Sequence, residues 1–192
     1  MTRATPHRKQ VRHFHDPGHY HELTFSCFRR MALLTTDSWR RLLSESIDRA
    51  VARHQFRTVA FVYMPEHVHL LVDPVVSDSR VDRLLYAIKR PFSYRIKQQL
   101  EQTANPLIEQ LTVRERPGKQ VFRFWQEGPG YDRNLKSSAV VLKAIDYIHN
   151  NPVRRGLCRD PEGWRWSSWK HYHRPEELRD PDLPQIDGLV GA

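Results

Sequence analysis

The chain has 192 residues and a mass of 22.8 kDa, a length that suits one domain with an ordinary hydrophobic core and leaves little room for two. Two cysteines without Cys-x-x-Cys spacing exclude a disulfide framework, and no apolar run approaches the ~20 residues of a membrane span, so we expect a cytoplasmic protein that does not cross a membrane. The 31 Lys and Arg residues against 22 Asp and Glu give a net charge of +9, which indicates a polyanionic partner and above all nucleic acid.

Charge and apolar periodicity divide the chain into three parts. Residues 1–19 are basic, rich in histidine and without an apolar period, which predicts a mobile basic arm. Residues 20–174 are expected to form the folded domain, ending in a basic and aromatic extension. Residues 175–192 are an acidic tail with a net charge of −4, against +13 for the rest of the chain. This contrast raises the hypothesis that the tail occupies a nucleic-acid groove and inhibits binding.

The first half of the domain predicts one strand, one helix and a hairpin of two strands. Residues 21–30 alternate apolar and polar side chains, as a half-buried strand does. Thr36 and Asp37 can cap a helix whose apolar residues recur at helical spacing through residue 54. Residues 57–62 and 67–72 are rich in Val, Phe and Leu, and the proline between them favours an antiparallel hairpin.

The second half predicts two more helices and one short strand. A helix is expected from residue 78 or 79 to residue 100, with Pro91 kinking or dividing it. Residues 101–119 lack a period and are expected to form a loop, after which residues 121–125 have the pattern of a strand. A last helix runs to Asn151, where Pro152 is expected to stop it. This order predicts an α+β fold: a ferredoxin-like split β-α-β antiparallel sheet with helices on one face and a further C-terminal helix.

Two histidines in the segment MPEHVHLLVD, His67 and His69, share one face of the second hairpin strand. Residues i and i+2 of a strand have Cα atoms roughly 6.6 Å apart and project together, so both imidazoles can converge on one cation. Three other His-x-His sequences occur in the chain, but only this pair has an apolar scaffold on both sides. The alternative is a solvent-facing strand with two unrelated histidines. No further Cys or His completes a zinc set, so an oxygen ligand and water would suit Mg²⁺ or Mn²⁺ acting on a phosphate.

Tyr147 and Asn151 lie one turn apart on the flank of the last predicted helix. They can therefore face one cleft at the edge of the core, where a phenolate serves as nucleophile while a cation neutralises a phosphate. The alternative for Tyr147 is a boundary tyrosine with its ring on the core and its hydroxyl in water. Tyr131, in the glycine-rich segment GPGYDR, is a rival nucleophile that lacks a helical partner at i+4.

Basic and aromatic side chains interleave after residue 113 and again after residue 153. Such a pattern suits tracking of a phosphate backbone combined with stacking of bases from a single strand. The candidate nucleic-acid-binding residues are Arg123, Trp125, Arg133, Lys136, Arg154, Arg155, Trp164 and Lys170. The alternative is that the aromatic residues belong to the core and the charges are merely solvated.

The sequence resembles the single-tyrosine HUH transposases, which are insertion-sequence-200-like transposases, and specifically their REP-associated tyrosine branch. The resemblance covers roughly residues 20–172 and rests on MPEHVHLLV, followed about eighty residues later by YIHNNPVRRGL, with FWQEGPGYDRNL between them and WRWSS after. In that family the histidine pair binds a divalent metal, which implies His67 and His69 as ligands. The family tyrosine attacks DNA, which implies Tyr147 as the nucleophile and Asn151 as a third ligand, although relatives outside this branch have glutamine there.

The resemblance also implies what the protein binds and does. Its partner would be single-stranded hairpin DNA, such as REP-like palindromes, bound by a monomer or homodimer that is nucleoid-associated when it holds DNA. We expect a metal-dependent single-stranded DNA endonuclease and strand transferase that acts through a 5′-phosphotyrosine intermediate. One alternative is a nucleic-acid-binding module with vestigial catalysis. Another is a hydrolytic nuclease in which the metal activates water.

Overall fold

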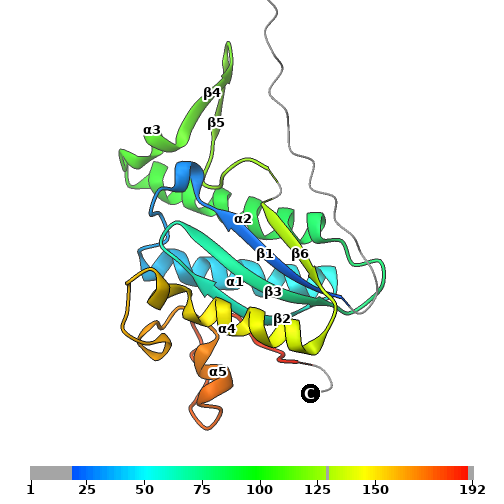
Figure 1. The fold of residues 1–192 in the computed structure, drawn as a ribbon. Helices are drawn as coiled ribbons and strands as arrows, with labels where there is room; N and C mark the ends of the chain where they lie inside the picture. Colours follow the sequence, from blue (N-terminus) through cyan, green and yellow to red (C-terminus); the bar gives the residue numbers. More distant parts are fainter. Residues whose placement is uncertain (1–18, 129, 190–192) are drawn as a thin grey trace, which may run out of the picture.

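The computed structural model describes residues 19–128 and 130–189 (Figure 1). Nearly all of the basic arm predicted for residues 1–19, and the last three residues of the acidic tail, therefore lie outside the described part. No helix within the described residues has the length and apolar character needed to span a membrane.

A four-stranded antiparallel sheet in the order β2-β3-β1-β6 forms the centre of the fold. Its strands are β1 (Tyr20–Ser26), β2 (Phe56–Tyr63), β3 (His67–Pro74) and β6 (Tyr131–Leu135). The register of β1 against β3 sets Ser26 opposite His67 and Thr24 opposite His69. Directly opposed residues of an antiparallel pair project to the same face, so these four side chains share one side of the sheet.

Helices cover both faces of this sheet (Figure 1). On one face, α1 (Asp37–His54) and α2 (Val81–Gln102) enclose the larger core, which includes Phe25, Val68 and Leu70. On the other face, α4 (Ser138–Arg154) packs Ile145 and Ile148 against β2 and β3. The predicted α+β sheet with two helices on one side and an added C-terminal helix is confirmed. Because alternate residues of β3 enter different layers, the histidines face the α4 side while their neighbours anchor the strand in the larger core.

The fourth strand of the sheet differs from the sequence prediction. Residues 121–125 were expected to form it, but β5 (Lys119–Phe122) instead pairs with β4 (Thr112–Arg116) in a separate hairpin preceded by α3 (Leu107–Leu111). The loop expected for residues 101–119 was also wrong, because this segment contains α3 and β4. The fourth strand is instead β6, at the edge of the sheet opposite β2, and its sequence YDRNL is polar because only its last residue is buried. Phe124 and Trp125 are buried in the larger core, which explains their apolar pattern.

Three element boundaries also depart from the prediction. The first strand ends at Ser26, and residues 28–30 form a 3-10 turn, η1 (Phe28–Arg30). Pro91 does not divide α2, which continues to Gln102. Pro152 lies inside α4, which ends at Arg154 rather than Asn151. Both prolines lie inside helices, and Pro152 is buried against the core although its missing N–H removes one helical hydrogen bond.

The C-terminal segment returns to the side of the sheet bounded by β2. It includes η2 (Pro161–Gly163) and α5 (Trp169–His173) before the acidic tail. Asp187 exchanges hydrogen bonds with the backbone of Thr58 at the edge of β2, and Arg165 pairs with Asp180 and Asp182. The described part of the tail therefore packs against β2 and α1, where Asp182 also pairs with Arg41 and the backbone N–H of Gln185 donates to Asp48.

Candidate active site

His67 and His69 are both buried on the face of β3 that α4 covers. Their Nε2 atoms lie 3.0 Å apart, and their rings meet edge to face with centroids 4.8 Å apart. The predicted convergence of the pair is therefore present. The alternative of a solvent-facing strand with unrelated histidines does not fit two buried imidazoles that point at each other.

The Nδ1 atom of each histidine faces an oxygen. Thr24 Oγ1 on β1 lies 2.9 Å from His69 Nδ1, and Glu66 Oε1 lies 3.2 Å from His67 Nδ1. When Nδ1 carries the proton toward these oxygens, the lone pair of each Nε2 is directed into the space between the rings. A metal-binding histidine has this arrangement, in which an outer partner fixes the tautomer and orientation of the ring.

Burial keeps both imidazoles neutral. Burial, aided by the neighbouring His67 and opposed by Glu66, lowers the pKa of His69 to about 4. Burial also lowers the pKa of His67, although the carboxylate of Glu66 counteracts this. For Glu66, burial favours the protonated form, but attraction to His67 and Arg155 outweighs it and holds the pKa below its ordinary value. The pair therefore offers neutral nitrogens beside an anionic carboxylate, which is the donor chemistry that a divalent cation needs.

Tyr147 lies on α4 directly across from the histidines. Its ring meets that of His69 edge to face, with centroids 5.7 Å apart, and the side chain is 40% exposed. The guanidinium of Arg154 lies 5.0 Å from the centroid of the same ring. Arg155 Nη1 reaches the Oε1 atom of Glu66 at 2.8 Å. The end of α4 therefore brings a solvent-accessible phenol and two cations to the histidine pair.

Asn151 is buried one turn beyond Tyr147, and its Nδ2 donates a long hydrogen bond, 3.4 Å, to the Tyr147 carbonyl. Its assignment as a metal ligand stays a prediction. Within residues 19–128 and 130–189, no three His, Cys, Asp or Glu side chains form a metal-binding group. A cation on His67 and His69 would thus take its other ligands from a carboxamide, water or a phosphate. The 3.0 Å spacing of the two Nε2 atoms is compatible with adjacent ligands about 2.1 Å from one octahedral ion, so the residues fit Mg²⁺ or Mn²⁺.

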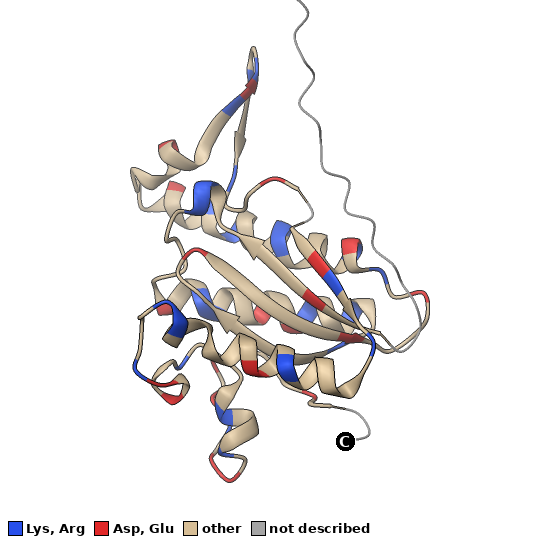
Figure 2. Cartoon of the chain, viewed as in Figure 1, with Lys and Arg blue, Asp and Glu red and all other residues tan. Residues whose placement is uncertain are grey.

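Lys and Arg residues are spread over helices, strands and connecting segments (Figure 2). The predicted nucleic-acid-binding residues separate into two groups. Arg154 and Arg155 lie at the site, and Arg133 lies on the same face of the sheet, 3.5 Å from Glu22 on β1. Lys136 is exposed at the junction between β6 and α4. The three arginines can line one surface around Tyr147, whereas Lys136 lies beyond the opposite end of α4 from Arg154.

The other four predicted residues make contacts within the protein itself. Trp125 is only 7% exposed and packs on Phe25 and Phe92, which favours the alternative that it is a core residue. Trp164 donates its Nε1–H to the carbonyl oxygen of Tyr63. Each of the remaining two is paired with acidic side chains at the surface: Arg123 with Glu115 and Glu127, and Lys170 with Glu177.

Tyr131, the rival nucleophile, lies in β6 rather than in a glycine-rich loop. It is opposite Thr24 in the register and 55% exposed, so it belongs to the same cross-strand row as Thr24 and His69. Gly130 permits this close docking, because a Cβ there would come within 2.4 Å of the Thr24 carbonyl oxygen and its φ is +81°. Sequence reasoning missed both Thr24 and Glu66. Glu66 was visible in PEHVH, whereas Thr24 is selected only by the pairing of β1 with β3.

Comparison with known proteins gives three findings. A family model described as "Transposase IS200 like" matches residues 17–112. A curated protein of Haemophilus influenzae, named as a REP-associated tyrosine transposase, is 30% identical over 122 residues, which cover 63% of this chain and 61% of that protein's length. A solved structure of a REP-associated tyrosine transposase bound to a REP hairpin superposes with a TM-score of 0.68 over 96% of each chain, at 19% identity.

Proposed function

The chain belongs to the IS200-like transposase family, and from this premise we propose that it cleaves and rejoins single-stranded DNA with Tyr147 as the nucleophile. One observation carries the proposal: the exposed phenol of Tyr147 lies against His69, whose Nε2 faces that of His67. Nucleophile and candidate metal ligands therefore come from a helix and a strand that are rigidly packed on each other.

The proposed step is a transesterification. The phenolic oxygen of Tyr147 loses its proton and attacks a backbone phosphorus. A new bond forms between this oxygen and phosphorus, the bond from phosphorus to the 3′ oxygen breaks, and the departing 3′ oxygen takes up a proton. The products are a 5′-phosphotyrosyl link and a free 3′-hydroxyl. Attack by another 3′-hydroxyl on the link reverses the step and joins the strands, so no external energy source is needed.

The residues around Tyr147 would bind the phosphate, hold the cation and orient the histidines. Arg154 lies over the phenol ring and can attract the phosphate, while Arg155 is held by Glu66 near the histidines. A divalent cation, when held by His67, His69 and, as predicted, Asn151, would supply charge neutralisation at the phosphate. Thr24 and Glu66 would keep both histidines in the ligating tautomer.

We propose single-stranded DNA that folds into hairpins as the substrate. The solved structure that shares the fold is of a protein bound to a REP hairpin, and the basic composition of this chain suits the same class of ligand. Tyr131 and Arg133 on β6 extend the surface beside Tyr147 with one exposed aromatic ring and one cation. Such a pair suits a base and a phosphate of an unpaired segment.

The test is a search for the covalent intermediate. Wild type, Tyr147→Phe and the matched control Tyr131→Phe would be incubated with 5′- and 3′-labelled hairpin DNA from the flanks of the gene, with Mn²⁺ or Mg²⁺. We expect a denaturation-resistant protein–DNA adduct in the wild type and Tyr131→Phe, and none in Tyr147→Phe. Cleavage that persists in Tyr147→Phe without any adduct would instead indicate a water-using nuclease. Binding without cleavage would indicate a recognition module.

Metal binding has its own readout. Calorimetric titration of Mn²⁺ should give one site per chain in the wild type and at least ~10-fold weaker binding in His67→Ala and in His69→Ala. Equal Mn²⁺ affinity in all three proteins would show that His67 and His69 are not metal ligands.

A further inference from the structure

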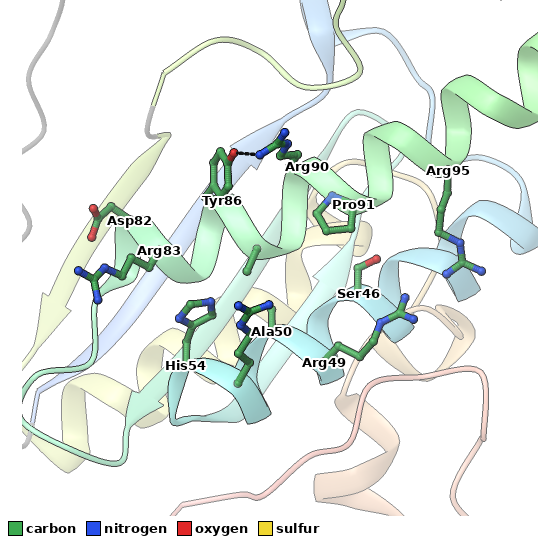
Figure 3. Close-up of a pocket in the computed structure, with 12 residues that line it drawn as sticks. Ser46, Arg49, Ala50, His54, Asp82, Arg83, Tyr86, Arg90, Pro91 and Arg95 are labelled. Carbon is green, nitrogen blue, oxygen red and sulfur yellow. Dashed lines mark hydrogen bonds between the residues drawn. The ribbon is translucent and has the colours of Figure 1, made fainter.

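A groove of about 800 Å³ lies between α1 and α2, on the side of the sheet opposite the histidine pair (Figure 3). Its lining includes small and apolar groups, among them Ala50, Ala87 and Pro91. The lining also carries six basic side chains from the two helices: Arg49, Arg53, His54, Arg83, Arg90 and Arg95. None of these residues takes part in the site described above.

The positive charge of this groove is only partly compensated. Glu45 pairs with Arg49 and Arg95, at 3.6 Å and 2.6 Å. Asp82, the acidic residue of the lining, forms its ion pair with Arg80 outside the groove. Within the described part of the chain, no carboxylate lies within ion-pair distance of Arg53, Arg83 or Arg90.

Mutual repulsion among these cations is evident at His54. Its pKa is lowered by burial and further by the charges of Arg53 and Arg83. Like charges held around one concave surface are unfavourable for folding and become favourable when an anion enters. The helices thus maintain an arrangement that a polyanion would stabilise.

The exposed side of α2 adds aromatic rings to the charge. Tyr86 and Tyr94 are 60% and 62% exposed, and they stand two turns apart with Arg90 between them. Arg90 donates a hydrogen bond to the phenol oxygen of Tyr86, and its Cζ lies 5.4 Å from the ring centroid (Figure 3). Alternating cations and exposed aromatic rings along one stripe suit a nucleic-acid strand, whose phosphates and bases alternate in the same way. An acidic protein surface would need the cations but not the rings.

A second hollow of about 310 Å³ adjoins this groove. It shares Asp82, Tyr86 and Arg90 with the groove and adds Leu85, Lys89, Ser93 and Gly128. Gly128 lies just before β6, the edge strand that carries Tyr131 and Arg133 on the α4 side. A chain that leaves the histidine site across β6 would therefore meet Arg90 as it turns around the sheet edge.

We propose that the α1–α2 groove is a second DNA-binding surface, which holds the phosphate backbone of a segment flanking the one presented to Tyr147. The choice of DNA as the polyanion rests on the proposed function, whereas the groove itself rests on its charges and rings. The two surfaces occupy opposite faces of the sheet, so a short oligonucleotide can fill only one of them. Longer DNA would contact both by passing over β6.

The test removes charge from the groove without touching the active site. Arg53 and Arg83 are exposed and belong to different helices, so the double variant Arg53→Ala/Arg83→Ala should fold normally. The charge-matched control is Arg41→Ala/Arg179→Ala, which removes two exposed arginines outside the groove. Affinity for hairpin DNA with long single-stranded flanks would be measured by fluorescence anisotropy from about 50 mM to about 200 mM salt.

We expect the groove variant to bind long DNA about ten-fold more weakly at low salt. We also expect the slope of log affinity against log salt concentration to become shallower, by about one to two in magnitude. Tyr86→Ala should weaken binding at least about five-fold with the slope unchanged, because it removes stacking rather than charge. The control should lose far less affinity than the groove variant. Equal affinity and slope in the groove variant and the wild type would overturn the proposal.

The experiments distinguish an error in the groove proposal from an error in the proposed function. The binding measurement needs no cleavage, so it reports on the groove even if Tyr147 forms no adduct. Conversely, the groove variant should form the Tyr147 adduct normally on an oligonucleotide too short to leave the α4 face. Loss of that adduct together with unchanged binding of long DNA would place Arg53 and Arg83 at the cleavage site and contradict the second surface.

Discussion

The hydroxyl oxygen of Thr24 lies 2.9 Å from Nδ1 of His69, across the ladder between β1 and β3. The direction of this hydrogen bond depends on the tautomer of His69. If Nδ1–H donates to the hydroxyl, Nε2 keeps its lone pair and can bind a cation beside His67. A residue that no motif contains therefore lies in hydrogen-bond contact with one that the motif does contain.

Thr24→Val tests this relationship with almost no change of shape. We expect Mn²⁺ affinity to fall about 10- to 100-fold, because an outer partner of a ligating histidine usually contributes that much. Thr24→Ser, which keeps the hydroxyl, should retain most of the affinity. Isothermal titration of each purified variant with Mn²⁺ gives the comparison. If Val and Ser variants bind Mn²⁺ equally well, Thr24 does not orient His69.

Gly130→Ala tests the docking of β6. A Cβ at this position would meet the Thr24 carbonyl oxygen at 2.4 Å, and the φ of +81° is strained for any side chain. We expect a loss of at least about 2 kcal/mol in the free energy of unfolding, measured by urea denaturation. Gly118→Ala is the matched control, because Gly118 has φ +75° but no atom within 4 Å of the added Cβ. Equal losses in both variants would mean that strain alone, and not the contact with Thr24, limits position 130.

Lys89 gives a pH dependence with a definite sign. Burial lowers the pKa of its ammonium from the ordinary 10.5 to about 8. Between these values the folded protein has released the proton and the unfolded chain still holds it, so the wild type gains stability as pH rises through this window. Below it, the folded state carries the full cost of a buried charge.

Lys89→Met removes this cost at every pH. We therefore expect the difference in melting temperature, variant minus wild type, to shift in favour of the wild type as pH rises from about 7 to about 10. Differential scanning fluorimetry of both proteins in the same buffers measures it. A difference that does not change with pH would contradict the burial of the Lys89 ammonium.

Trp125 separates the core interpretation from the DNA-binding one. Because the ring packs on Phe25 and Phe92, Trp125→Ala should cost roughly 3–5 kcal/mol in the free energy of unfolding. The indole nitrogen has no hydrogen-bond partner among the described residues, so Trp125→Phe should fold with a much smaller loss. DNA affinity of Trp125→Phe, measured by anisotropy, should match the wild type. A selective loss of affinity in that variant would restore Trp125 to the DNA-binding surface.

The sequence by itself determined the features that depend on local spacing. Alternation in a strand directs His67 and His69 to one face and their apolar neighbours to the other, because successive side chains must point in opposite directions. Helical spacing places Tyr147 and Asn151 on one flank in the same way. The α+β class follows from the order of these periods along the chain.

Only the tertiary structure decided which distant residues meet. The strand pairing that selects Thr24 for His69 joins residues 45 positions apart, and the polar β6 gave no strand signal because an edge strand needs little apolar surface. Trp125 is buried and Arg154 is at the site for reasons of packing that composition does not record. The α1–α2 groove likewise exists because two helices bring arginines from separate segments together. The apolar period of each helix does not predict which residues of the other helix it will face.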